Sequence, residues 1–294
     1  MLPELATTIN GHWVHNLPKF VPLLPHTDQI GVRYYGLAYV LGFVGGIWLL
    51  MQYARKGRSL VPKADVMDLL FMLMLGVFLG GRLGWFLLYH PELLIDSPLE
   101  FFRVWQGGMA SHGGFIGVGI ALAVYSIRRH VPYFHLSDLI VSTAPLGLML
   151  GRIANFINGE LWGKIYDGKL GIIFPESGSP GEPLSEIPPR YPSQLFEAGL
   201  EGLLLFIYFQ WRFWKSDVVQ RKPGQLTGEF LIAYAIVRAI GELFREPDEG
   251  VTPIMGLSRG TFYSLFLIVG GIIILVTKRN PLLLPKAESP AATL

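Results

Sequence analysis

Long apolar stretches constrain this chain more than any other feature of its sequence. There are about seven of them, each close to the roughly 20 apolar residues that are needed to cross a bilayer. Only 16% of the 294 residues are charged, against about a quarter in soluble domains. The sequence therefore predicts an all-α membrane protein, a bundle of about seven transmembrane helices. The expected spans lie near residues 33–53, 66–89, 109–127, 137–157, 194–213, 227–245 and 259–277.

Lysine and arginine are unequally divided between the loops on the two sides of these spans. The side that includes the loops near 55–63, 128–129 and 212–222 holds 13 basic residues, and the opposite side holds 7. Because cytoplasmic loops carry an excess of basic residues, the first side is expected to be cytoplasmic. The N-terminus is then outside and the C-terminus is inside.

Three regions outside the expected spans complete the predicted domain organisation. Residues 1–32 are rich in proline and aromatic residues and form an N-terminal arm at the outer membrane surface. Within the transmembrane domain, residues 33–280, the Gly- and Pro-rich loop 159–193 forms a small irregular head on the outer side. Residues 281–294 form a disordered cytoplasmic tail. The N-terminal sequence lacks a basic segment followed by an apolar one, so no cleavable signal peptide is expected.

Polar residues collect at the end of the fourth expected span, in the stretch GRIANFINGELWG. Arg152, Asn155, Asn158 and Glu160 all fall there. An unpaired polar group in hydrocarbon costs several kcal/mol, and a charge at mid-bilayer costs about 3 kcal/mol or more. These side chains are therefore expected to face the protein interior, a wet cavity or a polar ligand.

A polar stripe follows the sixth expected span, where Tyr234, Arg238, Glu242 and Arg245 lie within about 80° of one another on a helix. One interpretation is an Arg238–Glu242 pair that holds helices together. The other is that Arg238 and Arg152 converge on an anion, because guanidinium groups suit bidentate binding of phosphate. Both stay open.

Glycine-rich stretches surround two further candidates. His112 lies in GGMASHGG and is either a base that works at neutral pH or a hydrogen-bonded structural residue. Gly76, Gly80 and Gly84 have the small-xxx-small spacing that packs transmembrane helices closely. Tyr35 opens the first span, where an interfacial aromatic residue is the default expectation.

Several classes of function are excluded by what the sequence lacks. With 0 cysteines the chain has no disulfide, thiolate metal site or cysteine nucleophile, and no spacing typical of a metal site or cofactor motif occurs. A net charge of +2 is too small to suggest a nucleic-acid partner. A solute transporter or lipid scramblase would need repeat symmetry and polar residues through the full membrane depth. A membrane scaffold would use its buried arginines only to brace helices.

Between about Tyr34 and Lys278 the chain resembles the bacterial prolipoprotein diacylglyceryl transferases. The resemblance is carried by GVFLGGRLGWFLLYH, FRVWQGGMASHGG, GRIANFINGELWG, RYPSQLFEAGLEG and AYAIVRAIGELFREPD. It implies transfer of a diacylglyceryl group from phosphatidylglycerol to the thiol of the lipobox cysteine of a preprolipoprotein, forming a thioether and releasing glycerol phosphate. It also implies a seven-helix membrane bundle with a small periplasmic head. The protein is expected to be a monomer in the bacterial inner membrane, with a periplasmic N-terminus and a cytoplasmic C-terminus, and to use no cofactor or metal.

The resemblance also implies the site residues. The catalytic residues are expected to be His112, Arg152 and Arg238. Residues expected to bind the phosphatidylglycerol headgroup or line the site are Tyr35, Asn155, Asn158, Gly159, Glu160, Gly163, Tyr234, Glu242 and Arg245. Asp138 matches a further family position. Gln106 and Tyr191 depart from the family pattern, which has an acid and a histidine at these places.

Overall fold

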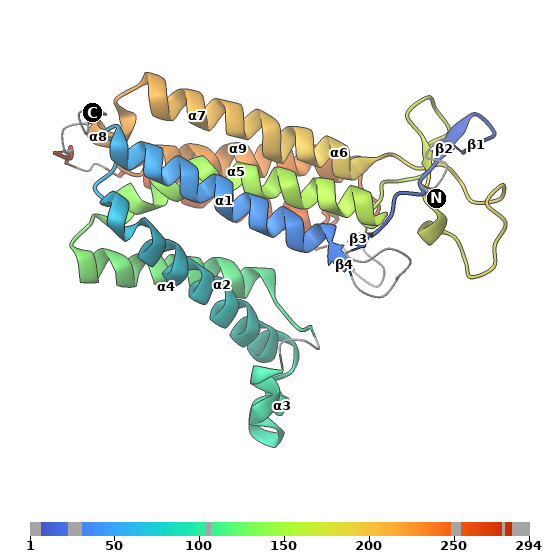
Figure 1. Cartoon of the computed structure of the whole chain (residues 1–294), viewed down its shortest axis with the longest axis horizontal. Helices are drawn as coiled ribbons and strands as arrows, with labels where there is room; N and C mark the ends of the chain where they lie inside the picture. The colour runs from blue at the N-terminus through green and yellow to red at the C-terminus, as the bar shows by residue number, and fades with distance from the viewer. Residues whose placement is uncertain (1–6, 23–30, 104–106, 248–253, 278–279, 284–294) are drawn as a thin grey trace. The chain divides into compact units, whose positions relative to one another are not determined.

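Helices make up most of the protein (Figure 1). The computed structural model describes residues 7–22, 31–103, 107–247, 254–277 and 280–283. The helices are α1 (Tyr34–Arg55), α2 (Val66–Tyr89), α3 (Pro91–Asp96), α4 (Ser111–Arg129), α5 (Tyr133–Asn158), α6 (Ser193–Glu197), α7 (Leu205–Lys215), α8 (Val218–Arg221), α9 (Gln225–Glu242) and α10 (Arg259–Val276).

The predicted membrane class is confirmed by the lengths and composition of these helices. Three segments in the described part of the chain are long and apolar enough to cross a membrane: Tyr34–Arg55, Lys63–Leu87 and Tyr133–Asn158. A helix also lies over each of the other expected spans, although those helices are shorter or more polar. The mostly helical membrane fold is thus confirmed, and the count of seven spans stays a prediction.

The fifth expected span is not a uniform α-helix. Between α6 and α7 the backbone forms a π-helical segment, η5 (Ala198–Leu204). Such wide turns are rare and are often found at functional sites. This one directly follows Glu197 and contains Glu201, and both of these side chains are completely buried.

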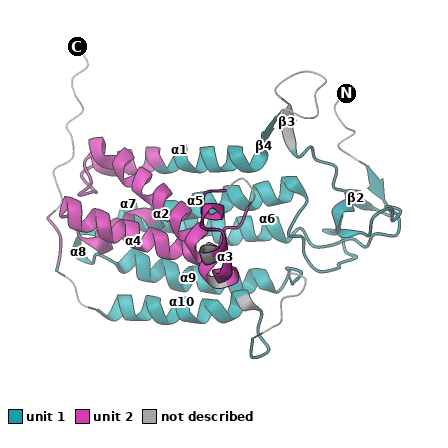
Figure 2. Ribbon diagram, turned by 90° about the horizontal axis from the view of Figure 1, so that it is seen from below, with its two compact units in different colours: residues 1–46, 141–280 teal, residues 47–140, 281–294 magenta. Residues whose placement is uncertain are grey.

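The chain divides into two compact units (Figure 2). Unit 1 comprises Met1–Gly46 and Val141–Asn280, and unit 2 comprises Ile47–Ile140 and Pro281–Leu294. In unit 1, the N-terminal part of α1 lies beside α5, while α6, η5, α7 and α10 pack against α9 (Figures 1 and 2). The small strands of unit 1 lie beyond one end of these helices.

Two small sheets occur in unit 1. β1 (Thr8–Ile9) pairs antiparallel with β2 (His12–Val14), and β2 pairs parallel with β5 (Ile172–Ile173). The second sheet joins β3 (Phe20–Pro22) to β4 (Gly31–Arg33). The N-terminal arm and the loop 159–193 therefore share a sheet, with Val14, Ile173 and Ile187 buried together. We call these joined segments the head.

In unit 2, α2 and α4 pack closely through glycines, as their spacing predicts. A Cβ atom on Gly80 would lie 2.4 Å from the carbonyl oxygen of Gly113, and one on Gly76 would lie 2.5 Å from that of Gly117. No side chain fits there without separating the two backbones. The interpretation of these glycines as helix-packing residues is confirmed.

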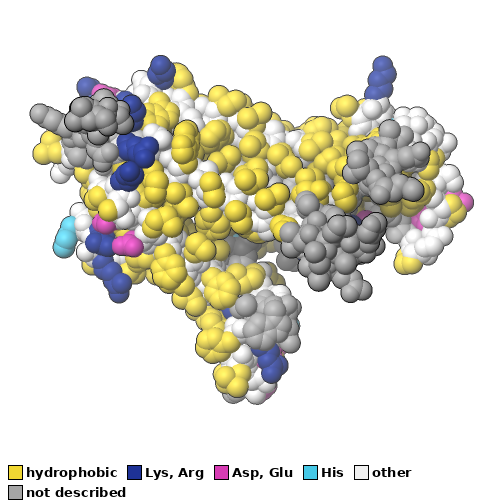
Figure 3. Space-filling view, in the orientation of Figure 1, with side chains coloured by type: hydrophobic (Ala, Val, Ile, Leu, Met, Phe, Trp, Pro, Cys, Tyr) yellow, Lys and Arg dark blue, Asp and Glu magenta, His cyan; other side chains and the backbone are white. Residues whose placement is uncertain are grey.

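The surface has the division expected of a membrane protein. Hydrophobic side chains cover the lengths of the helices, and lysine and arginine side chains gather near helix ends, among them the end that leads into α8 (Figure 3). Exposed apolar residues on α1 include Val40, Val44 and Trp48. In water this surface would be unfavourable, whereas in lipid it needs no cover.

Candidate active site

The C-terminal end of α5 supplies the first part of the candidate site. The helix stops at Asn158, and Gly159 takes a positive φ of 68°, which glycine adopts without strain. The backbone N–H of Glu160 donates to the carbonyl of Asn155 at 3.1 Å, which is the bond of a Schellman cap. This turn places the Glu160 side chain back over the last turn of α5.

A hydrogen-bonded network of polar side chains results. Asn155 Nδ2 donates to Glu160 Oε1 at 2.9 Å and also to the hydroxyl oxygen of Tyr35, and Asn158 Nδ2 lies 3.4 Å from the same Glu160 oxygen. Gln194 of α6 donates to the Glu160 backbone carbonyl at 2.7 Å. The structure therefore joins the start of α1, the end of α5 and the start of α6 at one place.

The head covers this turn through His15. A Cβ atom on Gly159 would lie 3.1 Å from the His15 ring, and that ring stacks on Phe174 with centroids 5.3 Å apart. His15 is only 5% exposed, and this burial lowers its pKa below the usual value of 6.5. The imidazole is therefore held in its neutral form against the end of α5.

The second part of the site is a set of charged side chains that we call the Arg–Glu cluster. Its members come from α5, from α6 and η5, and from α9 with the turn that follows it. They are Arg152, Glu197, Glu201, Arg238, Glu242 and Arg245.

Two glutamates hold the arginines of this cluster. Arg152 lies 2.9 Å from Glu197 Oε2 through Nη1 and 3.1 Å from Glu201 Oε2 through Nη2. Arg238 Nη1 lies 2.8 Å from Glu197 Oε1 and 3.4 Å from Glu201 Oε1. The same two carboxylates therefore bridge both guanidinium groups. Glu197 Oε2 makes no aligned hydrogen bond despite its distance from Arg152, so that contact is ionic.

Glu242 and Arg245 complete the cluster. Arg238 also pairs with Glu242, one turn along α9, so the predicted structural pair exists. Arg245 lies beyond the end of α9, where we had expected the helix to continue, yet its guanidinium still comes within 4.0 Å of Glu197. The expected pairing and the expected convergence of Arg152 with Arg238 therefore occur together.

Charge and burial are unevenly distributed in the cluster. Three arginines face three glutamates, so the cluster is neutral overall when all are ionised. Glu197 and Glu201 are 0% exposed, whereas the side chains of Arg152 and Arg238 are 15% and 14% exposed. The carboxylates lie behind the guanidinium groups, which form the more accessible face.

Gly163 joins the loop after α5 to the end of α9. Its N–H donates to the carbonyl of Tyr191 at 2.9 Å, and a Cβ atom there would lie 2.6 Å from both the Phe244 carbonyl oxygen and the Tyr191 Cβ. Gly163 also forms a β-bridge with Arg245. Only glycine fits between these backbones, and this packing fixes Arg245 beside the cluster.

Eleven of the twelve predicted site residues lie in unit 1, and His112 lies in unit 2. His112 occupies the first turn of α4 and is exposed. Tyr234 stacks on Phe230, one turn before Arg238 on α9. Tyr191 stacks on Tyr166 with centroids 4.0 Å apart.

Two further positions were named from the family pattern. Asp138 is fully buried in α5 within unit 2. Gln106 lies outside the described residues.

Three residues of the site were not predicted from the sequence: Gln194, Glu197 and Glu201. A signal for the glutamates existed, because two carboxylates four residues apart in an apolar span are expensive and must be paired. Gln194 precedes Glu197 by three residues, so it lies on the same face of α6.

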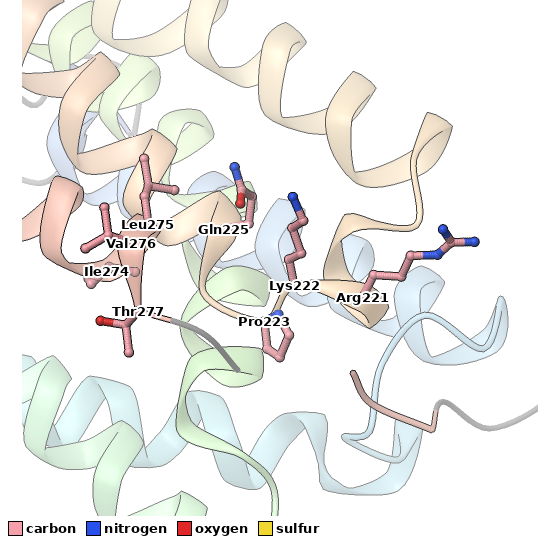
Figure 4. A pocket seen from close by; sticks show the side chains of 8 residues that line it. All are labelled: Arg221, Lys222, Pro223, Gln225, Ile274, Leu275, Val276 and Thr277. Carbon is pink, nitrogen blue, oxygen red and sulfur yellow. The ribbon is translucent and has the colours of Figure 1, made fainter. Parts of the chain in front are cut away.

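No group of three His, Asp or Glu side chains that could hold a metal ion occurs within the described ranges. A cavity of about 460 Å³ lies elsewhere in unit 1, between the loop before α9 and the end of α10 (Figure 4). It is lined by Arg221, Lys222, Pro223, Gln225, Ile274, Leu275, Val276 and Thr277. Arg238 lies 13 residues after Gln225, a distance of about 20 Å along α9, so this cavity is separate from the cluster.

The chain is similar to one family of known proteins over nearly its whole length. A model of the prolipoprotein diacylglyceryl transferase family matches residues 22–277. A phosphatidylglycerol–prolipoprotein diacylglyceryl transferase of Dechloromonas aromatica is 41% identical over 262 residues, which are 88% of this chain and 95% of the relative. One of Rhodospirillum rubrum is 41% identical over 273 residues, 91% and 96% of the two chains. One of Salmonella choleraesuis is 39% identical over 282 residues, 89% and 94%.

Proposed function

The chain belongs to the prolipoprotein diacylglyceryl transferase family, and from this membership and the Arg–Glu cluster we infer how its residues carry the reaction. The protein transfers the diacylglyceryl group of phosphatidylglycerol to a prolipoprotein, the first step of lipoprotein maturation. The thiol sulfur of the lipobox cysteine attacks the glyceryl carbon that bears the phosphate ester. A C–S bond forms, the C–O bond breaks, and glycerol phosphate leaves with the electron pair.

The observation that carries the proposed mechanism is the bridging of Arg152 and Arg238 by the same buried carboxylates. Among the described residues, Arg152 donates through Nε and Nη2 and makes an ionic contact through Nη1, whereas Arg238 donates twice through Nη1 and contacts Glu242 through Nη2. These contacts leave at least two of the five N–H groups of each guanidinium without a glutamate acceptor. Two N–H groups on each arginine can therefore donate to a phosphate. We assign the donor phosphate to this face, because both guanidinium groups are more accessible than the carboxylates behind them.

The role of Glu197 and Glu201 follows from this placement. Each carboxylate fixes both guanidinium groups and offsets their charge in a dry environment. Preorganised donors of this kind stabilise charge as it develops in the transition state, since they need no reorganisation. Here the charge develops on the phosphate oxygen as the C–O bond breaks.

We place the glycerol part of the donor headgroup at the network of Tyr35, Asn155 and Glu160. A hydroxyl, an amide and a carboxylate supply both donors and acceptors for its two hydroxyl groups. The network also shares α5 with Arg152, which is less than one turn before Asn155. A headgroup that bridges the two parts of the site would be held at both its phosphate and its glycerol.

We assign the thiol proton to His112. A free thiol has a pKa of about 8.5 and needs a base at neutral pH. His112 is exposed in the first turn of α4, where a substrate peptide can reach it. Glu160, Glu242 and bulk water are the other possible acceptors.

The proposed architecture is a seven-helix bundle in the bacterial inner membrane. The head and N-terminus would be periplasmic and the C-terminus cytoplasmic, as the basic loops predict. In unit 1 this agrees with the position of Arg212, Lys215 and Arg221 at the ends of α7 and α8, away from the head. Because one chain supplies every proposed site residue, a monomer suffices.

Binding of the donor phosphate by Arg152 and Arg238, which we call the clamp, is tested by measuring thioether-linked lipid with purified protein, phosphatidylglycerol vesicles and a lipobox peptide. Arg152→Lys and Arg238→Lys keep the charge and lose the planar fork. Losing a charged contact in a dry site costs about 2–4 kcal/mol of transition-state stabilisation, or roughly 30- to 1,000-fold in kcat/KM. Near-full activity in both variants would rule out the clamp.

The His112 assignment has its own test. Removing a general base typically costs about 10²–10⁴-fold, so His112→Gln should be slowed to that extent while donor binding survives. The defect should shrink as the pH rises toward the thiol pKa, where the substrate ionises unaided. A defect that is the same at every pH would instead make His112 a residue that shapes the turn.

A further inference from the structure

Arg82 of α2 is a buried arginine that the proposed mechanism does not use. It is 2% exposed and lies in unit 2, together with His112. Its guanidinium donates to the backbone carbonyls of five residues in the segment before α4. They are Glu100, Phe101, Arg103, Gly107 and Gly108.

These bonds match the full capacity of the side chain. Nε donates to Phe101 at 2.9 Å, Nη1 donates to Gly107 and to Gly108 (3.0 Å), and Nη2 donates to Glu100 and to Arg103 (3.3 Å). A guanidinium has five N–H groups, so every one has a carbonyl acceptor. The chain is thus folded around Arg82 on both sides of residues 104–106.

Packing closes the same segment over the guanidinium. The Arg82 Cζ atom lies 5.1 Å from the centre of the Trp85 ring and 5.0 Å from that of Phe86, within the range of cation–π attraction. Gly108 has a φ of 80°, and a Cβ atom on it would lie 2.6 Å from Arg82 Nη1. The Ala110 N–H then donates to the Gly81 carbonyl at 2.9 Å. The segment is therefore fixed to α2 up to Ala110, the residue just before α4.

A charge buried in a membrane protein is usually paired with another charge. Among the described residues, the hydrogen bonds of Arg82 go instead to main-chain carbonyls of one irregular segment. That segment ends at Ala110, two residues before His112. The arginine thus sets the path by which the chain enters the first turn of α4.

We propose that Arg82 is a positioning residue for His112: it holds residues 100–103 and 107–110 around its guanidinium and so places the imidazole for the transfer reaction. This rests on the proposed role of His112 as the base. A structural brace would hold α2 and its loop together without regard to His112, and the two roles differ in how substitutions combine.

The test is a double-mutant cycle with Arg82→Lys and His112→Gln in the full-length protein. Lysine offers three donors without the planar fork, so at least two of the five carbonyls lose their partner. Alone, Arg82→Lys should lower kcat about 10- to 100-fold, a part of the 10²–10⁴-fold that a general base supplies. Its KM for phosphatidylglycerol should stay within about twofold, because every N–H group of Arg82 is used by a main-chain carbonyl and none is left for the headgroup. In the His112→Gln background, Arg82→Lys should cause no further loss.

Two further variants guard against a folding artefact. Gly108→Ala disturbs the same contact from the loop side and should show the same selective loss of kcat, again absent in the His112→Gln background. Arg129→Lys alters an exposed ion pair to Asp68 at the other end of α4 and should leave activity unchanged.

The possible failures are distinguishable. Two results would overturn the positioning role and leave the base assignment standing. One is full activity of Arg82→Lys. The other is a slow His112→Gln enzyme that Arg82→Lys slows further by the same factor as it slows the wild type. Full activity of His112→Gln overturns the base assignment itself. Thioether formation by the wild-type protein reports separately on the transferase function.

Discussion

Replacing Glu197 with glutamine tests the Arg–Glu cluster directly, because this carboxylate contacts all three of its arginines. It lies 2.9 Å from Arg152, 2.8 Å from Arg238 and 4.0 Å from Arg245. Glutamine has nearly the same shape but no charge. The substitution therefore leaves the cluster with one excess positive charge and removes the ionic contact of Glu197 Oε2.

The size of the effect follows from burial. Breaking a fully buried pair by removing one partner costs about 3–5 kcal/mol. The arginine side chains here are 10–15% exposed, so water screens part of the excess charge. We therefore expect a total cost of about 2–4 kcal/mol; about half of it falls on the transition state and lowers kcat roughly 5- to 30-fold, and the rest lowers Tm.

KM separates this variant from the arginine variants. The extra positive charge attracts an anionic headgroup, so the KM for phosphatidylglycerol should stay the same or fall in Glu197→Gln. In Arg152→Lys it should rise, because a contact to the phosphate itself is lost. Both quantities come from initial rates of thioether formation at varied phosphatidylglycerol concentration.

Glu229→Gln is the matched control. Glu229 pairs with Arg212 between α7 and α9 at 2.5 Å, near the opposite end of the same helices. Its loss should lower Tm and leave kcat unchanged. If Glu197→Gln also kept its kcat and lost only stability, the cluster would be a brace between helices, and the reasoning above would be refuted.

Three further predictions concern the head and the topology. Burial lowers the pKa of His15, so below about pH 6.5 the unfolded chain binds a proton at His15 more readily than the folded chain does. Hydrogen exchange should therefore show a stable head above that pH and a less stable head below it, and His15→Asn should weaken this pH dependence. In Gly163→Ala the new Cβ would lie 2.6 Å from the Phe244 carbonyl oxygen and the Tyr191 Cβ and would push these segments apart. Tm should therefore fall and kcat/KM should drop at least about tenfold, whereas unchanged rates would contradict the close packing at Gly163. Of single cysteines placed at the exposed positions Ser185 and Gln220, only the one at Ser185 should react with an impermeant thiol reagent on spheroplasts. Reaction only at Gln220 would mean that the topology is inverted.

The sequence predicted most of the helical fold because lipid imposes a strong local rule. Every backbone polar group must be satisfied within the membrane, so long apolar stretches can only be helices. Helix packing through Gly80 was predictable for a similar reason, since its spacing carries the geometry. The joining of the N-terminal arm to the loop 159–193 was not, because β2 and β5 pair across more than 150 residues with two or three residues each.

The sequence predicted the arginines of the site but not the two buried glutamates that hold them. The polar residues of GRIANFINGELWG and the stripe on α9 identified the arginines, since buried positive charges are conspicuous in an apolar sequence. Of their partners, Glu242 was predicted and is found with Arg238. Glu197 and Glu201 were missed, because periodicity shows that they share a face but does not show which helix that face meets. The opposite case is Arg82, whose acceptors are backbone carbonyls and so leave no mark in the sequence at all.

The neutrality of the cluster affects how tightly the donor and the released glycerol phosphate bind, and thereby kcat. Three unopposed arginines would bind phosphatidylglycerol tightly, but they would bind the released glycerol phosphate more tightly still, because it carries more negative charge. Tight binding of substrate and product alike does not raise kcat. In the proposed mechanism, Glu197 and Glu201 weaken the binding of both by offsetting the charge, while the guanidinium N–H groups are aimed at the oxygen on which charge develops. A cluster that is neutral when empty therefore favours the transition state over both the bound donor and the bound product.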